Sequence, residues 1–433
     1  MASKTHDIVG DADVIIVGGG PAGASTALHL ERLNPKLAAR TLVLEKSRHP
    51  RDKICGGALT LNAERILSEL GVVLDIPYAP VHHVRLVYGE ARFDLPEDGC
   101  AKRVIRRRDL DGALFQAVQD RHVPTAEEVR VTRVIRQPNQ LLVVTDRGNY
   151  RAKVVVSADG VNAVLRRTSG FGPGKMSRIY EVKTPADPAN EPVFTEQILL
   201  IDLSYIREGL KGYYWDFPCY VDGQPFVSRG IVTGSRLGSR AFLKEILARR
   251  GISLEGTPTK AWPIRHFDPR ERLSQPRMLL VGDAMGSDPL FSEGISQGLA
   301  GGRLAAEALD DAFQRKDLSF SRYTKHVRQS RMGRELLAYC RAARFVYSRH
   351  AELSLSLLYE SQGLRDLIGH SYAGTANIYD SLPGIASHLA KHLLHVRRRV
   401  RSFRAAATAG DRTVSTEKAN ATLTETSVPG SVS

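Results

Sequence analysis

Asp13-Val-Ile-Ile-Val-Gly18-Gly-Gly20-Pro-Ala-Gly23-Ala-Ser-Thr-Ala27 is the stretch that decides the fold of this chain. The apolar run from Val14 to Val17 is typical of a buried parallel strand, and the residues from Ala22 to Leu33 favour a helix. The turn between them has the spacing Gly-x-Gly-x-x-Gly. Gly18 permits a tight turn. Gly20 has no Cβ, so a pyrophosphate can approach the backbone at the start of the helix.

The residues after this motif agree with it. A second apolar strand, Thr41 to Leu44, ends in Glu45, roughly twenty residues after Gly23. An acidic residue at this place accepts hydrogen bonds from a ribose 2′-OH and repels a 2′-phosphate, which favours FAD or NAD over NADP. Gly23 lets the helix pack close to the strand. Strand, glycines, helix and acid together predict a dinucleotide site.

Length and composition set the class of protein. The chain has 433 residues, enough for two or three domains, and its hydrophobic content of 42% and charged content of 25% are ordinary for a globular protein. The first apolar stretch is the strand itself, and no run reaches the about 18 uncharged residues of a membrane span, so neither a secretory signal nor a spanning helix is expected. Four widely spaced cysteines without C-x-x-C argue against a disulfide framework or a metal site and favour a cytoplasmic setting.

The charge balance is strongly basic, with a net charge of +14. It indicates either a solvated basic surface or attraction to an acidic partner or an anionic membrane. No zinc-finger or RRM pattern accompanies it, so no nucleic-acid partner is expected. Residues 384–401 form a basic amphipathic helix pattern, which fits contact with the inner face of a membrane, a partner helix, or a last helix packed on the domain. Residues 405–433 have no periodicity and are predicted to be disordered.

From Val81 the pattern changes to short alternating strands, which indicates a second, antiparallel sheet. Its expected strands are His83–Tyr88, Ala91–Leu95, Gln197–Asp202, Tyr213–Pro218 and Phe226–Val232, with a strand or arm at Lys260–Phe267. Gly170 to Ser177 is predicted to be a linker, and Val104 to Leu114 to return to helix. Three consecutive arginines open that helix. They are either a solvated charge run or a means of reaching phosphate oxygens.

Two stretches could line a ligand site or simply fill the core. Tyr213-Tyr-Trp215-Asp-Phe217-Pro is the densest aromatic run, and alternation places Tyr213, Trp215 and Phe217 on one face of a strand. That face suits a large apolar pocket or plain sheet core. Cys55-Gly56-Gly57 has adjacent glycines, which mark close backbone approach. Cys55 suits a small buried hydrophobe or a thiol beside a cofactor.

Two later strands end in residues suited to a ligand. Arg151 to Val156 leads into Asp159-Gly160, and a strand from Arg277 leads into Gly282-Asp283. Ligands of α/β proteins lie at such carboxyl ends, and Asp283 could accept a hydrogen bond from a sugar-alcohol hydroxyl. The helix expected from Ile295 to Ala312 points its first N–H groups at an electron-rich partner such as a flavin carbonyl.

Taken in order, these motifs resemble the FAD-dependent oxidoreductases built like p-hydroxybenzoate hydroxylase. The resemblance spans roughly residues 12 to 320 and rests on Gly18-Gly-Gly20-Pro-Ala-Gly23 with Glu45, Arg107-x-x-Leu-Asp111, Asp159-Gly160 and Gly282-Asp283-Ala284. Within them, Cys55-Gly-Gly, Tyr213-x-Trp-x-Phe-Pro and Gly282-Asp-Ala-Met-Gly286 through Glu293-Gly-Ile295 are similar to the geranylgeranyl reductase branch. Cys219 and Ser292 depart from that branch, which usually has Lys and Gly there.

The resemblance implies an α/β fold: a Rossmann-like FAD-binding domain (12–80, 100–175 and 269–318) with an inserted antiparallel β-sheet substrate domain (81–99 and 176–268). A C-terminal helical region (319–404) and a disordered tail (405–433) follow. It implies that Glu45 touches the adenosine ribose and that Arg107 and Asp283 touch the ribityl–pyrophosphate part. Cys55, Trp215 and Tyr213 are the catalytic candidates. The expected cofactor-binding residues are Gly18, Gly20, Ala22, Gly23, Glu45, Lys46, Cys55, Gly56, Gly57, Arg107, Asp159, Gly160, Gly282, Asp283, Pro289, Gly294 and Ile295.

The expected function is an FAD-dependent reductase acting on isolated C=C bonds of a polyprenyl (geranylgeranyl-type) lipid. With no second nucleotide motif visible, NAD(P)H or a ferredoxin-type protein would be the electron donor. One alternative is a monooxygenase of the same fold, against which Gly286 argues because aromatic hydroxylases more often carry His there. The other is a flavoprotein that serves as an assembly or binding partner.

Overall fold

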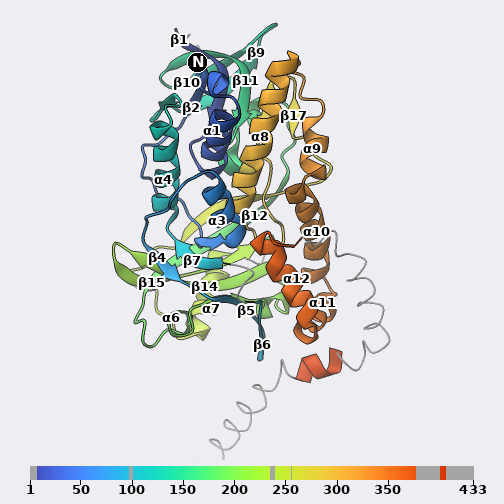
Figure 1. Cartoon of the computed structure of the whole chain (residues 1–433). Coiled ribbons are helices and arrows are strands. Elements are labelled where there is room, and N and C mark those ends of the chain that lie inside the picture. Colours follow the sequence, from blue (N-terminus) through green and yellow to red (C-terminus); the bar gives the residue numbers. More distant parts are fainter. Residues whose placement is uncertain (1–6, 97–100, 235–238, 255, 377–399, 406–433) are drawn as a thin grey trace, which may run out of the picture.

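This computed structural model of the chain describes residues 7–96, 101–234, 239–254, 256–376 and 400–405. Figure 1 shows two stacked parts, with a mainly parallel sheet and its helices above and a second sheet below. The C-terminal helices run along one side and reach both parts. The molecule is therefore the expected α/β structure with a Rossmann-type domain, a second sheet and C-terminal helices.

The first sheet has eight strands, and five of them pair in parallel with a neighbour: β18, β11, β1, β2 and β8. β1 (Ile8–Val17) lies between β2 (Thr41–Leu44) and β11 (Gly148–Ser157), and both pairs are parallel. The order is β17-β18-β11-β1-β2-β8; β10 also pairs with β11, and β9 pairs with β10. The other bounds are β8 Thr125–Ala126, β9 Val131–Arg136, β10 Leu141–Thr145, β17 Ser274–Gln275 and β18 Met278–Leu280.

Register brings the functional strand ends to one edge. Val17 pairs with both Leu44 and Ser157, and Ser157 pairs with Leu280. Because these strands are parallel, the residues that follow each of them meet at the carboxyl edge of the sheet. The glycine turn, Glu45, Asp159 and Asp283 are therefore neighbours although more than two hundred residues separate the first from the last.

Two helices rich in small residues cover one face of this sheet. α1 (Pro21–Leu33) packs along α8 (Ile295–Arg315), as Figure 1 shows. A Cβ on Gly302 would lie 2.7 Å from the Ser25 side chain, and the Ser25 hydroxyl donates to the Leu299 carbonyl at 2.7 Å. Small residues thus permit the close approach of the two helices that both start at the cavity described below.

The second sheet has seven strands in the order β16-β12-β15-β14-β13-β5-β6. It is mostly antiparallel, as expected, but β13 and β5 pair in parallel, and the long stretch of chain between them supplies the crossover that such a pair requires. The bounds are β5 His83–Tyr88, β6 Ala91–Asp94, β12 Lys175–Pro185, β13 Ile198–Asp202, β14 Gly212–Val221, β15 Gln224–Thr233 and β16 Lys260–His266. β3 (Ala58–Thr60), β7 (Ala101–Ile105) and β4 (Tyr78–Pro80) form a small third sheet.

Two local expectations were wrong. Val104 and Ile105 end strand β7, where they pair with β3 and β4, and helix α4 (Arg107–Asp120) begins only after them. The linker predicted at Gly170 to Ser177 ends earlier, because β12 begins at Lys175 and pairs with both β15 and β16. In both places strand pairing outweighs the local pattern.

The remaining helices are α2 Pro35–Ala38, α3 Leu61–Glu69, α5 Val164–Thr168, α6 Pro192–Thr195, α7 Arg240–Arg249, α9 Tyr323–Gln329, α10 Arg331–Val346, α11 Ala351–Glu360 and α12 Gln362–Ala373. No helix among the described residues is long and apolar enough to cross a membrane. The predicted basic helix at 384–401 lies outside the described residues apart from its last two positions, and so does nearly all of the predicted tail.

Candidate functional site

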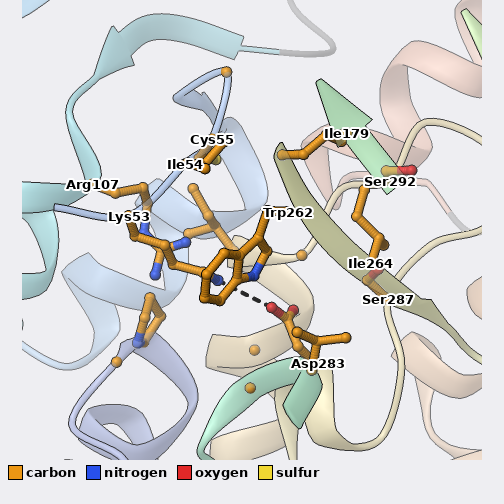
Figure 2. Close-up of a pocket in the computed structure, with 18 of the residues that line it drawn as sticks. Lys53, Ile54, Cys55, Arg107, Ile179, Trp262, Ile264, Asp283, Ser287 and Ser292 are labelled. Atoms are coloured by element: carbon orange, nitrogen blue, oxygen red, sulfur yellow. Dashed lines mark hydrogen bonds and ion pairs between the residues drawn. The ribbon is translucent and has the colours of Figure 1, made fainter. Parts of the chain in front are cut away.

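A cavity of about 910 Å³ opens at the carboxyl edge of the first sheet and extends onto the inner face of the second. Its walls come from the glycine turn, the loop after β2, the Cys55 loop, and strands β12, β14 and β16. Figure 2 shows side chains from the Cys55 loop, β12 and β16 around the same space as Asp283. All but two of the residues predicted from sequence to bind a cofactor or act in catalysis line it, the exceptions being Gly23 and Pro289.

The glycine turn leaves an opening that the protein itself does not fill. Gly20 has φ −77° and ψ −174°, a conformation that any residue adopts, and a Cβ placed on it would first meet the tip of Arg51 at 3.5 Å. The start of α1 carries no side-chain cap. The chain therefore gives no steric reason for glycine here, whereas a pyrophosphate against the uncapped helix would. Gly23 differs, since its Cβ would lie 1.9 Å from the Gly18 carbonyl oxygen, and its role is packing.

Glu45 stands beside this opening. Its carboxylate is buried and accepts hydrogen bonds from the backbone N–H groups of Gly19 (2.8 Å) and Ser47 (3.1 Å). Arg51 approaches it at 3.4 Å. These contacts hold the carboxylate at the end of β2, where it lines the cavity together with Lys46. The position suits a ribose hydroxyl, which a carboxylate recognises as an acceptor.

Arg107 lies beneath the same opening in a buried ion pair. Its Nε and Nη2 donate to the two carboxylate oxygens of Asp111 at 2.7 and 2.9 Å, one helical turn along α4. Burial would raise the pKa of Asp111, but the Arg107 guanidinium holds it below its ordinary value. Arg51 adds a second cation at 3.2 Å from Asp111. The pair fixes Arg107 at the cavity wall, where it carries positive charge toward the glycine turn.

At the other end of the first sheet's edge, Asp283 pairs with Lys53 at 3.0 Å. Burial would raise the pKa of Asp283, and the Lys53 ammonium lowers it. Figure 2 shows the Trp262 ring lying beside this pair. The indole Nε1 of Trp262 is buried without a hydrogen-bond partner among the described residues. An orphan donor in a cavity wall fits a bound group that supplies an acceptor.

The Cys55 loop packs against the aromatic strand. A Cβ on Gly56 would meet the Phe217 ring at 2.8 Å, and one on Gly57, where φ is +88°, would meet the Ile105 carbonyl oxygen at 2.1 Å. Tyr213, Trp215 and Phe217 are buried on the cavity side of β14. Tyr214 faces the α7 side of the sheet. The aromatic run was expected to line a pocket or to fill the sheet core, and this geometry supports the pocket. The two glycines let the Cys55 backbone lie against that wall.

The other predicted residues lie around these. Asp159 accepts hydrogen bonds from the Ser157 hydroxyl (2.5 Å) and the Val164 N–H (2.7 Å), and burial raises its pKa. It lines the cavity with the other predicted members Gly18, Ala22, Gly160, Gly282, Gly294 and Ile295. Pro289 does not line the cavity, although Ser287 and Phe291 on either side of it do. The residue after it, Leu290, contacts the C-terminal helices, where its carbonyl accepts from Tyr347 at 2.5 Å.

Glu293 was not among the predicted site residues, although its motif was. It lines the cavity and accepts hydrogen bonds from the Ser296 N–H (2.8 Å) and hydroxyl (2.7 Å), and burial raises its pKa to about 7. The folded state therefore favours the neutral acid, while the unfolded chain ionises at the ordinary value. Stability contributed by this group falls as pH rises from about 4.5 to about 7.

We expect Glu293→Gln to remove the loss of stability that Glu293 causes as pH rises. The variant should gain on the order of 2–3 kcal/mol relative to the native protein between mildly acidic and neutral pH, because an amide does not ionise. Urea unfolding at both pH values measures it. Asp288 and Glu335 also have raised pKa values, of about 6 and 7, so the stability of the variant still falls somewhat as pH rises. The test is therefore the difference between the two proteins in the slope of unfolding free energy against pH. Parallel slopes would show that Glu293 is ionised in the folded protein.

Sequence reasoning missed several residues of the cavity wall, notably Arg51, Lys53, Glu181, Trp262 and Ser292. Lys53 lies just before the Cys55-Gly-Gly motif and Ser292 just before Glu293-Gly-Ile, but nothing local sets them apart from surface side chains. Glu181 lies on β12, part of which was expected to be linker. Trp262 could have been found as an aromatic residue on a predicted strand that returns to the first domain. Among the described residues no group of three metal-ligating side chains exists.

Comparison with known proteins agrees with this geometry. The FAD binding domain family matches residues 11–207. A menaquinone reductase of Mycolicibacterium smegmatis is 28% identical over 319 residues, which cover 69% of this chain and 76% of that protein. A digeranylgeranylglycerophospholipid reductase of Methanocella arvoryzae is 24% identical over 367 residues, which cover 75% and 84%.

Solved structures are similar to this fold over most of the chain. A geranylgeranyl bacteriochlorophyll reductase-like protein from Thermoplasma acidophilum has a TM-score of 0.65 at 20% identity and covers 91% of this chain and 99% of its own. A halogenase variant in complex with FAD has a TM-score of 0.60 at 13% identity, with coverage of 95% and 97%. Residues 11–207 therefore match an FAD binding domain, and over most of its length the chain is similar to FAD-dependent oxidoreductases. Among these, its sequence is similar to geranylgeranyl-type reductases, and its fold is similar to that of a geranylgeranyl bacteriochlorophyll reductase-like protein.

Proposed function

We propose that the protein is a flavin-dependent reductase that saturates isolated C=C bonds of a polyprenyl, geranylgeranyl-type lipid. Bound and reduced FAD would supply the hydride for this chemistry. Gly20 and the start of α1 would hold the pyrophosphate, Glu45 the adenosine ribose, and Asp283 with Lys53 the ribityl side. The protein's own part is to hold the alkene in a dry pocket and to provide a proton.

The observation that carries the proposal is the apolar half of the cavity. Beyond the predicted cofactor site, the wall continues along the inner face of the second sheet with buried apolar and aromatic side chains: Val84, Leu199, Ile201, Tyr213, Trp215 and Phe217. A small polar aromatic substrate does not need so extended an apolar surface, whereas a branched hydrocarbon chain does. The Tyr213 hydroxyl donates to the Phe291 carbonyl at 2.5 Å, so its polar end is satisfied and the wall stays apolar.

A feature beside the cavity also favours the reductase over the monooxygenase. Gly286 has φ +118°, and a Cβ there would lie 2.6 Å from the Phe267 nitrogen. The backbone has no space for the histidine that aromatic hydroxylases more often carry at this position. The halogenase likeness, at 13% identity, concerns the fold alone.

Two parts of the proposal concern partners. The electron donor would be NAD(P)H or a ferredoxin-type protein, and the lipid would be taken from a membrane surface to which the basic residues 384–401 bind. The strongly basic composition supports such a contact, because anionic lipid attracts Lys and Arg side chains.

The test is a single-turnover reaction under anaerobic conditions. Protein whose FAD has been reduced chemically is mixed with geranylgeraniol or its phosphate ester, and the lipid is analysed by mass spectrometry. We expect flavin oxidation only in the presence of lipid, together with a gain of two hydrogens per reaction. In a parallel reaction with ¹⁸O₂, incorporation of the label into the lipid would make the protein a monooxygenase and overturn the proposal.

Cys55→Ala tests the thiol in this scheme. Cys55 lines the cavity and is half-buried, so we expect FAD to stay bound at full stoichiometry and turnover to fall by about tenfold or more, since the reacting wall loses its polarisable group. Flavin content is read from absorbance and turnover from the lipid assay. Cys340→Ala is the matched control, because that thiol is also half-buried but does not line the cavity. Equal turnover in both variants would make Cys55 a packing residue.

A further inference from the structure

We infer that Glu181 supplies the proton to the substrate, a role that rests on the proposed function. Glu181 is on β12 and is 3% exposed, yet its side chain lines the cavity opposite the Cys55 loop. A buried carboxyl group needs hydrogen-bond partners, and Glu181 has one in Ser228 on the neighbouring strand β15.

A short relay connects Glu181 to the aromatic strand. The Ser228 hydroxyl donates to the Glu181 Oε1 at 2.8 Å and accepts from the Trp215 indole Nε1 at 3.3 Å. Register explains the contact: Gly230 on β15 pairs with Glu181 on one side and with Trp215 on the other. A Cβ on Gly230 would lie 2.3 Å from the Trp215 ring, so glycine lets the ring lie flat across the strand toward the carboxyl group.

The Cys55 loop completes the surroundings of the acid. Cys55, on the loop that packs against the aromatic strand, lines the same cavity as Glu181. The carboxyl group is thus held by Ser228 in the part of the cavity where substrate and cofactor would meet. A positioned acid in a water-poor pocket is what protonation of an alkene carbon requires.

Burial favours the protonated form of this acid. It raises the pKa of Glu181, and three nearby groups act in the other direction: Lys183 on the same strand, Lys260 on β16 and the Ser228 hydroxyl. The Cys219 thiol, which faces Glu181 from β14, has a raised pKa as well, to about 11, and stays neutral. Lys260, which is paired with Glu181 across β12 and β16, is exposed and also lines the cavity, so the proton would return to the carboxylate from this solvent-facing side.

In the proposed step the π bond of the alkene breaks and two C–H bonds form. Bound reduced FAD would supply the hydride and Glu181 the proton, which would leave the saturated lipid, oxidised FAD and a carboxylate. A proton from water would then return to Glu181. Reduced nicotinamide or a reduced ferredoxin-type protein would restore the flavin.

The experiment compares Glu181→Gln with the native holoenzyme and with Glu335→Gln. Glu335 is a matched control, since it is a buried acid with a raised pKa on α10 that does not line the cavity. We expect Glu181→Gln to keep FAD and lipid binding while single-turnover reduction of geranylgeraniol slows by about 10²–10⁴-fold. Glu335→Gln should turn over at the native rate. Ser228→Ala should stay active with the alkaline limb of its pH profile moved to higher pH, because the carboxylate loses a donor and the pKa of Glu181 rises further.

A second readout does not depend on turnover. Infrared difference spectra between native and Glu181→Gln holoenzyme should contain a carboxylic-acid C=O band near neutral pH, and its absence would overturn the assignment. Turnover of Glu181→Gln within about threefold of native would also overturn it while leaving the reductase function intact. If the native enzyme reduces no polyprenyl probe, the function falls and the proton-donor role falls with it, whatever the infrared spectrum contains.

Discussion

Gly20→Val should abolish FAD binding while leaving the fold intact. The backbone at Gly20 lies in the extended region, and the nearest protein atom to an added Cβ is the flexible tip of Arg51 at 3.5 Å. The folded chain therefore accommodates the side chain, whereas the pyrophosphate that would lie against the start of α1 does not. We expect FAD affinity to fall by at least about 10³-fold, about 4 kcal/mol, because close backbone approach is the basis of phosphate binding at such turns.

Purified protein gives the readout through its flavin absorbance and a titration with added FAD. Thermal unfolding of FAD-free native protein and variant should agree within a few degrees, which separates loss of the ligand from loss of the fold. Gly363→Ala serves as the control, since a Cβ there meets open space and the residue lies on α12 outside the cavity. Stoichiometric FAD in Gly20→Val would contradict the location of the phosphate site.

Arg107→Met should cause the largest loss of stability among simple changes in the cavity wall. It leaves the Asp111 carboxylate, which is fully buried, with Arg51 at 3.2 Å as its remaining cation. Removing one partner of a buried pair typically costs about 3–5 kcal/mol, because the other charge stays desolvated. We expect that loss in urea unfolding, together with weaker FAD binding.

A second substitution separates charge from packing. Adding Asp111→Asn to Arg107→Met should restore most of the lost stability but not the FAD affinity, since an amide is less costly to bury than a carboxylate. Arg315→Met is the matched control: its i,i+4 pair with Asp311 is exposed on both sides, so its loss should cost less than about 1 kcal/mol. If Arg107→Met lost no more unfolding free energy than Arg315→Met, the buried Arg107–Asp111 pair would not stabilise the site.

The parts of the site that follow directly from sequence are those formed by short, contiguous segments. Strand β1, the glycine turn and helix α1 are local, and the apolar period and the glycine spacing specify them without reference to the rest of the chain. The alternation along β14 placed Tyr213, Trp215 and Phe217 on one face for the same reason, since side chains of any strand alternate. The sequence predicted Gly23 and Pro289 as cofactor-binding residues, but neither lines the cavity. The motif spacing does not say which residues face the ligand and which pack the turn.

The composition of the cavity wall depended on strand order in space. Glu181 meets Ser228 and Trp215 because β12, β15 and β14 are neighbours, and that order follows from pairings across loops of variable length. Trp262 arrives from the edge strand β16 and Arg51 from an irregular loop, and neither position has a periodic signal. Local chemistry along the chain therefore determined the class of cofactor. The proton donor, the orphan indole and the apolar wall arise only when long-range pairing removes these side chains from water and sets their hydrogen-bond partners.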